Sequence, residues 1–149
     1  MSGQLKTFLD HLAYRWMAHR PYPKMFNKVG LVISTAAGAG TKKVTRSLRD
    51  NLFHWGTPKI YSYGKNVGAS SWETVKPEKK LKIEKEVKKI SSQIKKQIGK
   101  AKPGFKTRAM FLIMRLGQKA NDWNPTDKEY WVENGWLDSN RPWERRNKP

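Results

Sequence analysis

Two short apolar segments, separated by a glycine-rich turn and an amphipathic segment, constrain this chain most. Residues 28–34 read KVGLVIS, residues 35–43 read TAAGAGTKK, and residues 59–63 read KIYSY. Residues 28–34 are apolar on both faces, as is typical of a buried parallel strand. Between the two segments, apolar side chains recur at helical spacing over residues 42–55, and Gly56 follows as a helix stop. The order predicts a strand–helix–strand unit with parallel strands.

Helices are predicted on both sides of this unit. Residues 2–19 have one apolar face with Ser2 as the cap, and the prolines after residue 20 end the pattern. Residues 77–98 form a long amphipathic pattern with a narrow apolar stripe, which could cover one face of a sheet. Residues 105–119 have an unusually apolar centre at 109–114, and the tail 121–143 contains four tryptophans.

Only two strands are recognisable, and two parallel strands make a poor sheet. Parallel strands need neighbours on both sides and cover on both faces. We therefore expect an unpaired edge on the strand at 28–34, and we interpret the chain as the second half of an open α/β sheet.

Composition limits the classes of function. The 149 residues contain 31 Lys plus Arg, 12 Asp plus Glu and no cysteine, for a net charge of +19. Without cysteine, disulfides and thiolate chemistry are excluded, and a cytoplasmic location is expected. No apolar run approaches the roughly 20 residues of a transmembrane helix, and the first residues do not resemble a signal peptide. The basic residues concentrate in 76–108, where interspersed glutamates favour a solvated helix face over a nucleic-acid-binding arm.

The glycine-rich turn is the main candidate site. The carboxyl end of a parallel strand is where α/β proteins bind phosphates or flat cofactors, and small residues let the backbone approach such a ligand. The turn matches neither the Walker loop nor the G-x-G-x-x-G pattern, so a plain strand–helix turn stays open as the alternative.

The chain also resembles a known family. SGQLKTFLDHL, KVGLVISTAAGAGTKKVTRSLRDNLFHWG, PKIYSYGKNVGAS and the tail KEYWVENGWL are similar to the later half of the flavodoxin-like NAD(P)H-dependent oxidoreductases, the NADPH-dependent FMN reductase group. The resemblance covers roughly residues 2–143. In the family motif near the first segment, Arg is usual where this chain has His11.

The resemblance implies a five-stranded parallel sheet with FMN at the carboxyl ends of the strands, held by three loops. The third loop corresponds here to six residues, which are the expected FMN contacts: Thr35, Ala36, Ala37, Gly38, Ala39 and Gly40. The family's phosphate loop and its second ring loop would precede Met1, so a truncated reading frame, a fragment or a split protein is expected. No catalytic residue is implied beyond the flavin.

The remaining motifs favour structural roles. His11, His19 and His54 are far apart in sequence, so no metal site is predicted. The tail tryptophans are expected to pack over a core or a dimer interface rather than stack on bases. The apolar centre at 109–114 is expected to cover a core or contact a dimer partner rather than bind a membrane.

These observations predict a flavodoxin-like half-domain at 1–70 and a basic helical extension with a tryptophan-rich tail at 71–149. The implied function is FMN-dependent oxidation of NAD(P)H with transfer to a small-molecule acceptor, and a homodimer or a companion chain would supply the missing strands. The alternative is a non-enzymatic fragment with a vestigial flavin site that binds a partner protein or a polyanion.

Overall fold

The computed structural model describes residues 1–120 and 122–144 of the chain. Residues 121 and 145–149, which belong to the predicted tail and extension, lie outside the described residues. Two short 3-10 turns, η1 and η2, lie between α1 and β1. The elements are, in order, α1 (Gly3–His11), η1 (Ala13–Arg15), η2 (Pro23–Asn27), β1 (Val29–Ala36), α2 (Thr41–His54), β2 (Lys59–Asn66), α3 (Pro77–Gln97), α4 (Phe105–Ala120) and α5 (Pro125–Glu133).

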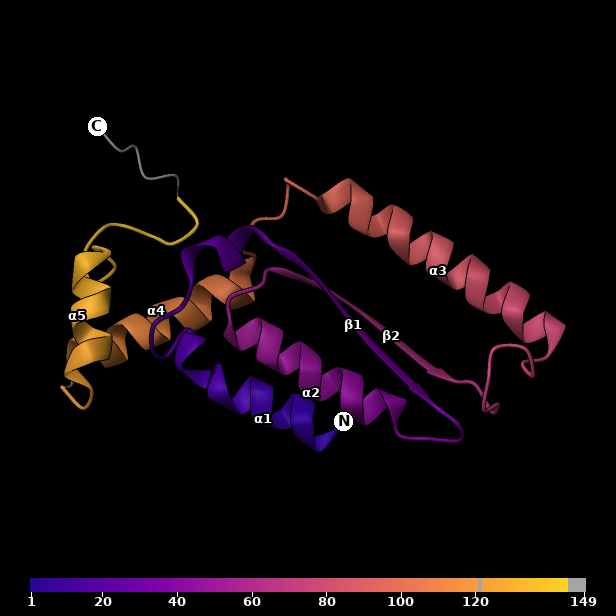
Figure 1. Cartoon of the computed structure of the whole chain (residues 1–149). Helices are drawn as coiled ribbons and strands as arrows, with labels where there is room; N and C mark the ends of the chain where they lie inside the picture. The colour runs from indigo at the N-terminus through magenta and orange to yellow at the C-terminus, as the bar shows by residue number, and fades with distance from the viewer. Residues whose placement is uncertain (121, 145–149) are drawn as a thin grey trace.

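The two strands form one parallel pair, in register from Val29 opposite Lys59 to Ala36 opposite Asn66. In the described chain β1 pairs with no other strand. Helix α2 packs along one face of the pair, and α3 runs along the other side of the strands (Figure 1). The predicted α/β class, with two parallel strands, flanking helices and a helical C-terminal part, is confirmed.

Close packing of α2 on β1 depends on a missing side chain. A Cβ placed on Gly30 would lie 2.8 Å from the Leu52 side chain and 3.4 Å from that of Thr57. The glycine therefore lets the helix approach the strand, while Val32 beside it is buried. This face of the sheet has the cover that the sequence predicts.

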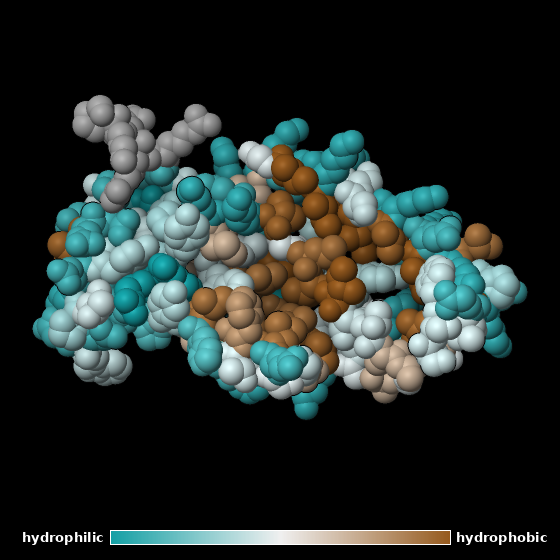
Figure 2. Space-filling model, in the orientation of Figure 1, coloured by the Kyte–Doolittle hydropathy of each residue, from teal (hydrophilic) through white to brown (hydrophobic). Residues whose placement is uncertain are grey.

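The opposite face of β1 is open. Leu31 and Ile33 are 41% and 56% exposed, and the prediction of a strand buried on both faces is wrong for this face. Helix α3 has no buried residue. Apolar side chains gather over the middle of the molecule in Figure 2, where β1 and α3 lie. The sheet therefore lacks full cover, in line with two parallel strands being too few.

The prediction of one helix over residues 2–19 is wrong after His11. Ser2 caps α1 as expected, accepting a hydrogen bond from the Leu5 backbone N–H. Beyond η1, the Met17 N–H donates to the His54 carbonyl at 2.7 Å, and the Met17 side chain is 1% exposed. Contacts with distant residues therefore replace the helical hydrogen bonds that local propensity favours.

The main core joins the N-terminal turns to the C-terminal helices. Its buried members are Met17, Phe26, Phe111, Trp131 and Trp136. The rings of Phe111 and Trp131 are stacked with centroids 4.8 Å apart, and Phe26 meets Phe111 edge to face at 5.8 Å. The prediction that tail tryptophans pack over a core is confirmed for Trp131 and Trp136 and is wrong for Trp123, which is 91% exposed.

Gly56 connects this core to the strand–helix–strand unit. Its φ of +92° is the left-handed conformation expected after a helix, and a Cβ there would lie 2.7 Å from the Phe26 ring. A side chain at this position would displace Phe26 from the core.

A buried carboxylate joins the two ends of the chain. Asp127 is 2% exposed, and its Oδ2 lies 2.7 Å from His19 Nδ1. Its Oδ1 lies 3.1 Å from Arg20 Nε, so each of these two atoms has the other as its partner in an ion pair. The Trp131 indole N–H also donates to the His19 carbonyl. Segment 17–21 is therefore held by α5 together with His54 of α2 and Gln118 of α4, which donates to the Ala18 carbonyl.

None of the helices in the described part of the chain is both long enough and apolar enough to span a membrane.

Candidate functional site at the carboxyl ends of the strands

The predicted flavin loop lies where β1 ends and α2 begins. Pairing with β2 continues through Thr35 opposite Lys65 and Ala36 opposite Asn66, so both residues are in the strand and not in the loop. The turn itself is short and ends at Gly40, whose φ of +96° is left-handed. Glycine adopts this conformation without steric cost. Helix α2 therefore begins directly after Gly40, at Thr41.

A pocket of about 320 Å³ opens beside this turn. One wall is the end of β1, and the other is the segment that follows β2. The residues that line it are Thr35, Ala36, Ala37, Val67, Ala69, Ser70, Ser71, Trp72 and Val75. Alanines and hydroxyls dominate, and no lining side chain is charged, so the pocket suits a flat, uncharged ring system.

Hydrogen bonds hold the two walls together. The Val67 N–H donates to the Ala36 carbonyl at 2.7 Å, and the Thr41 hydroxyl donates to the Asn66 side-chain oxygen at 3.1 Å. The Lys79 ammonium donates to the Val67 carbonyl at 2.6 Å. The start of α3 thereby fixes the segment after β2.

The aromatic group of the pocket is Trp72, which is 48% exposed. The Lys80 ammonium lies 5.6 Å from the centre of its ring. The Thr74 hydroxyl donates to the Ser71 carbonyl at 3.0 Å, which orders the turn around the tryptophan. A half-exposed indole beside small residues offers a surface on which a planar ligand can stack.

The six predicted contact residues separate into two groups. Thr35, Ala36 and Ala37 line the pocket, whereas residues 38–40 form the turn beyond its lining. A Cβ added to Gly38 would meet no atom within 4 Å, so the space beside the turn is open.

Sequence reasoning missed the second wall, which includes Val67, Trp72 and Val75. A signal was present, because the carboxyl ends of neighbouring parallel strands lie at the same edge of a sheet. The segment after residue 63 was therefore a candidate partner for the glycine-rich turn.

A charged cluster lies on the strand face opposite α2, next to this wall. Glu86 of α3 accepts hydrogen bonds from Tyr63 at 2.9 Å and from Lys65 at 2.6 Å. These bonds lower the pKa of Glu86, and the bond from Lys65 has the larger effect. Burial, followed by the bond to Glu86, raises the pKa of Tyr63 to about 12. The cluster connects α3 to β2 through hydrogen bonds to a charged carboxylate.

The histidines take separate positions. His54 closes α2 as expected, with its ring 5.1 Å from the Trp16 ring. His19 contacts Asp127, a pair that sequence spacing did not predict because 108 residues separate the two. In residues 1–120 and 122–144, no three His, Asp or Glu side chains are grouped so that they could hold a metal ion.

Comparison with protein families gives one match. Residues 1–69 match the family described as NADPH-dependent FMN reductase. The match is consistent with a member of the flavodoxin-like NADPH-dependent FMN reductase group and confirms the resemblance over this range. It includes both strands and the Thr35–Gly40 segment, but it ends before Trp72. No curated protein and no solved structure matches the chain.

Proposed function

We propose that this chain provides one side of the flavin site of an NAD(P)H-dependent oxidoreductase. The FMN ring would lie between the end of β1 and the segment containing Trp72. The observation that carries the proposal is the pocket beside Thr35–Ala37, because the family match covers the same three residues. The electron acceptor would be a small molecule, and the proposed location is the cytoplasm.

The lining fits the ring of FMN better than its phosphate. Ligand sites typically measure about 300–1,000 Å³, so a pocket of about 320 Å³ is at the small end of that range. Alanine walls and the Trp72 ring suit the flat isoalloxazine, and three hydroxyls can bond its polar edge. A phosphate needs cations or a helix N-terminus, and no lining residue is cationic.

The open edge of β1 offers a way to complete the site. A parallel strand paired there would bring its own carboxyl-end loop to the same edge of the sheet as Thr35. Leu31 and Ile33 are exposed on the uncovered face that the new strand would extend. We propose that a second copy of this chain or a companion chain supplies the strand and the phosphate-binding groups.

Within such a site, the described residues would position the flavin and exclude water. When bound, FMN supplies the hydride-transfer chemistry, and the protein supplies orientation and polarity. Trp72 and the two alanines would cover the ring, and the Thr35 hydroxyl would bond its edge. No residue of the chain is assigned as a proton donor or nucleophile.

The test is a titration of the purified chain with FMN, followed by flavin absorbance and fluorescence, with light-scattering sizing of the same sample. Saturable quenching is expected, and Trp72→Ala should weaken FMN binding at least about fivefold, because base–aromatic stacking contributes about 1–3 kcal/mol. Trp123→Ala is the matched control, since Trp123 is 91% exposed and does not line this pocket.

Two outcomes of this titration decide whether the flavin-site proposal holds. Saturable binding with an increase in particle mass supports a site completed between chains, and NADPH oxidation is then the next assay. No binding up to high micromolar FMN, in a sample that contains dimers or larger species, would contradict the proposal.

A second candidate function follows from the exposed basic helix. Helix α3 has no buried residue and lysines dominate its sequence, so the non-enzymatic alternative is binding of a polyanion or an acidic partner. Binding of a DNA duplex that weakens steeply with added salt would favour it. Salt-independent flavin binding without DNA binding would exclude it.

A further inference from the structure

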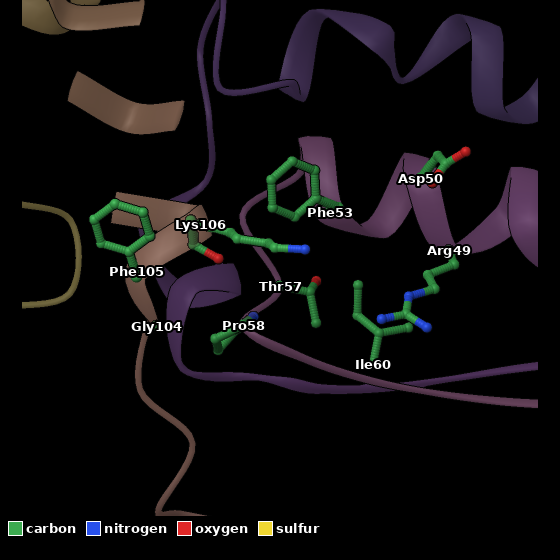
Figure 3. Close-up of a pocket in the computed structure, with 10 residues that line it drawn as sticks. Arg49, Asp50, Phe53, Thr57, Pro58, Ile60, Gly104, Phe105 and Lys106 are labelled. Atoms are coloured by element: carbon green, nitrogen blue, oxygen red, sulfur yellow. The ribbon is translucent and has the colours of Figure 1, made fainter. Parts of the chain in front are cut away.

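A larger cavity lies at the opposite end of the sheet, where the strands begin. Its volume is about 610 Å³, and it is bounded by the second half of α2, the start of β2 and the start of α4. Figure 3 shows the side chains that line it. The side chains that give the cavity its charge and its apolar surface are Arg49, Phe53, Thr57, Ile60, Phe105 and Lys106.

The cavity carries uncompensated positive charge. Neither Arg49 nor Lys106 makes an ion pair with a described side chain. The one acidic lining residue, Asp50, directs its carboxylate away from the Lys106 ammonium (Figure 3). Two cations therefore face a shared space without a counter-ion from the described chain.

The start of α4 adds to this charge. Its first turn contains no acidic residue, although it begins the 16-residue helix Phe105–Ala120. Lys106 and Arg108 lie within four residues of the helix start, where the helix dipole disfavours cations. An anion bound at this helix terminus would relieve the repulsion and accept hydrogen bonds from the free N–H groups of the first turn.

A buried hydroxyl without a partner points to a missing ligand independently of the charge. Thr57 is 1% exposed, and its Oγ1 has no hydrogen-bond partner in the described structure. Leaving a buried hydroxyl unsatisfied is costly. In Figure 3 the hydroxyl points into the space where the Lys106 ammonium ends. A ligand oxygen placed there would satisfy the hydroxyl and the cation together.

The rest of the lining is apolar. Phe53, Pro58 and Ile60 form one side, and the Phe105 ring, 86% exposed, stands at the other. An exposed aromatic ring at the mouth of a cavity offers a stacking surface. The lining therefore suits a ligand that joins an oxyanion to an apolar, planar body.

We propose that this cavity binds an aromatic oxyanion, either an aryl phosphate or an aryl carboxylate. Its anionic group is held by Arg49, Lys106, the Thr57 hydroxyl and the first turn of α4, and its ring lies against Phe53 and Phe105. Strand β1 spans eight residues, about 25 Å at the usual rise, between this end of the sheet and the Thr35 pocket. The two sites are therefore separate, and flavin binding is not required here.

The first experiment uses amide chemical-shift mapping of the full chain. Phenyl phosphate, benzoate, inorganic phosphate and benzyl alcohol are titrated separately. Phenyl phosphate or benzoate should shift the amides of Thr57 and residues 104–107, and whichever binds more tightly identifies the oxyanion class. Inorganic phosphate and benzyl alcohol should bind more weakly, since each supplies half of the required chemistry. Shifts scattered over the lysines of α3 would overturn the proposal.

Variants then separate the site from general charge. Lys106→Gln should weaken binding at least about tenfold, because hydrogen bonds to charged groups contribute about 1.5–3 kcal/mol. Lys102→Gln is the matched control, since it removes the same charge four residues earlier from an exposed side chain outside the lining. Equal weakening by both variants would overturn the proposal.

Thr57→Val distinguishes a ligand contact from a structural role. The nearly isosteric change removes the unpaired hydroxyl, so the melting temperature of the free chain should rise or stay unchanged while affinity for the aromatic oxyanion falls. A stabilised variant that binds as tightly as the parent chain would exclude Thr57 from the site. That outcome would overturn the proposal, because the charge and the cavity are not sufficient evidence for a site without the Thr57 hydroxyl.

Discussion

Strand β1 and the two helices α4 and α5 bury their apolar side chains very differently. On β1, Ile33 is 56% exposed, whereas Phe111 of α4 and Trp131 of α5 are completely buried. The difference is not one of hydrophobicity, since both regions contain large apolar residues. It arises because α4 and α5 close against residues of the N-terminal turns, while one face and one edge of β1 contact no described element that covers them.

This contrast teaches that the densest core is not at the candidate flavin site. The aromatic core draws Met17 and Phe26 from the predicted half-domain and Phe111 from the predicted extension. The sheet edge that positions Thr35 lies away from that core (Figure 1). Stability and ligand binding are therefore expected to respond to different substitutions, and the division at residue 70 stays a prediction.

Truncation of the core should have the largest effect. Phe111→Ala removes a ring that contacts Phe26, Trp131 and Trp136, and it should lower the free energy of unfolding by about 3–5 kcal/mol. Ile33→Ser, at an exposed position, should change it by less than about 1 kcal/mol. Urea denaturation followed by circular dichroism measures both. Similar losses would show that the two regions do not differ as described.

Loss of the contacts that Asp127 makes with His19 and Arg20 should have the second-largest effect on stability. Asp127→Ala leaves Arg20 and His19 without their buried partner. We expect the free energy of unfolding to fall by about 1–3 kcal/mol, a moderate loss because the side chains of Arg20 and His19 are partly exposed. Asp122→Ala is the control, since its carboxylate is 79% exposed and pairs with Lys128 at the surface. An equal effect of the two substitutions would show that the buried position of Asp127 adds no stability beyond that of a surface ion pair.

The open sheet face should control association rather than folding. Ile33→Lys places a charge on the uncovered face of β1, and charged residues at a strand edge oppose pairing. We expect a shift toward monomer in light scattering, with little change in melting temperature. Leu116→Lys, on an α4 residue that is 66% exposed, controls for added charge. A parent chain that is monomeric at every concentration would contradict a second copy of this chain as the strand partner and would leave only a companion chain.

The charged contact between α3 and β2 should have the smallest effect. The folded chain lowers the pKa of Glu86, so its contribution is present above the ordinary value of 4.5 and is lost as the pH falls through the lower folded value. Because the Glu86 side chain is 34% exposed and solvent screens its pairing with Lys65, the stability lost should be about 0.2–1 kcal/mol.

Hydrogen exchange of α3 amides measures this contribution. After correction for the intrinsic pH dependence of amide exchange, the protection factors of the α3 amides should fall below pH 4.5 in the parent chain, and Glu86→Gln should already lower them at neutral pH. Glu84→Gln, on an exposed position two residues earlier, should leave the profile unchanged. Identical profiles for the two variants would show that Glu86 does not fasten α3.

Much of the local structure could be predicted from the sequence. The strand predicted at 28–34 overlaps β1 (Val29–Ala36), the helix at 42–55 corresponds to α2, and the long amphipathic pattern at 77–98 corresponds to α3. The sequence did not predict α5, although Asn124 and Pro125 are a typical helix start and the Asn124 side chain accepts a hydrogen bond from the Asp127 N–H.

By itself, the sequence determined the class of the fold, the two parallel strands and the turn at their carboxyl end, because hydrophobic period and glycine position are local properties. Tertiary structure decided the end of α1 at His11, the pairing of His19 with Asp127 and the second wall that brings Trp72 beside Thr35. Each of these depends on contacts between residues far apart in the chain. Local propensity contains no information about such contacts, and their packing free energy outweighs the small preferences that a single segment expresses.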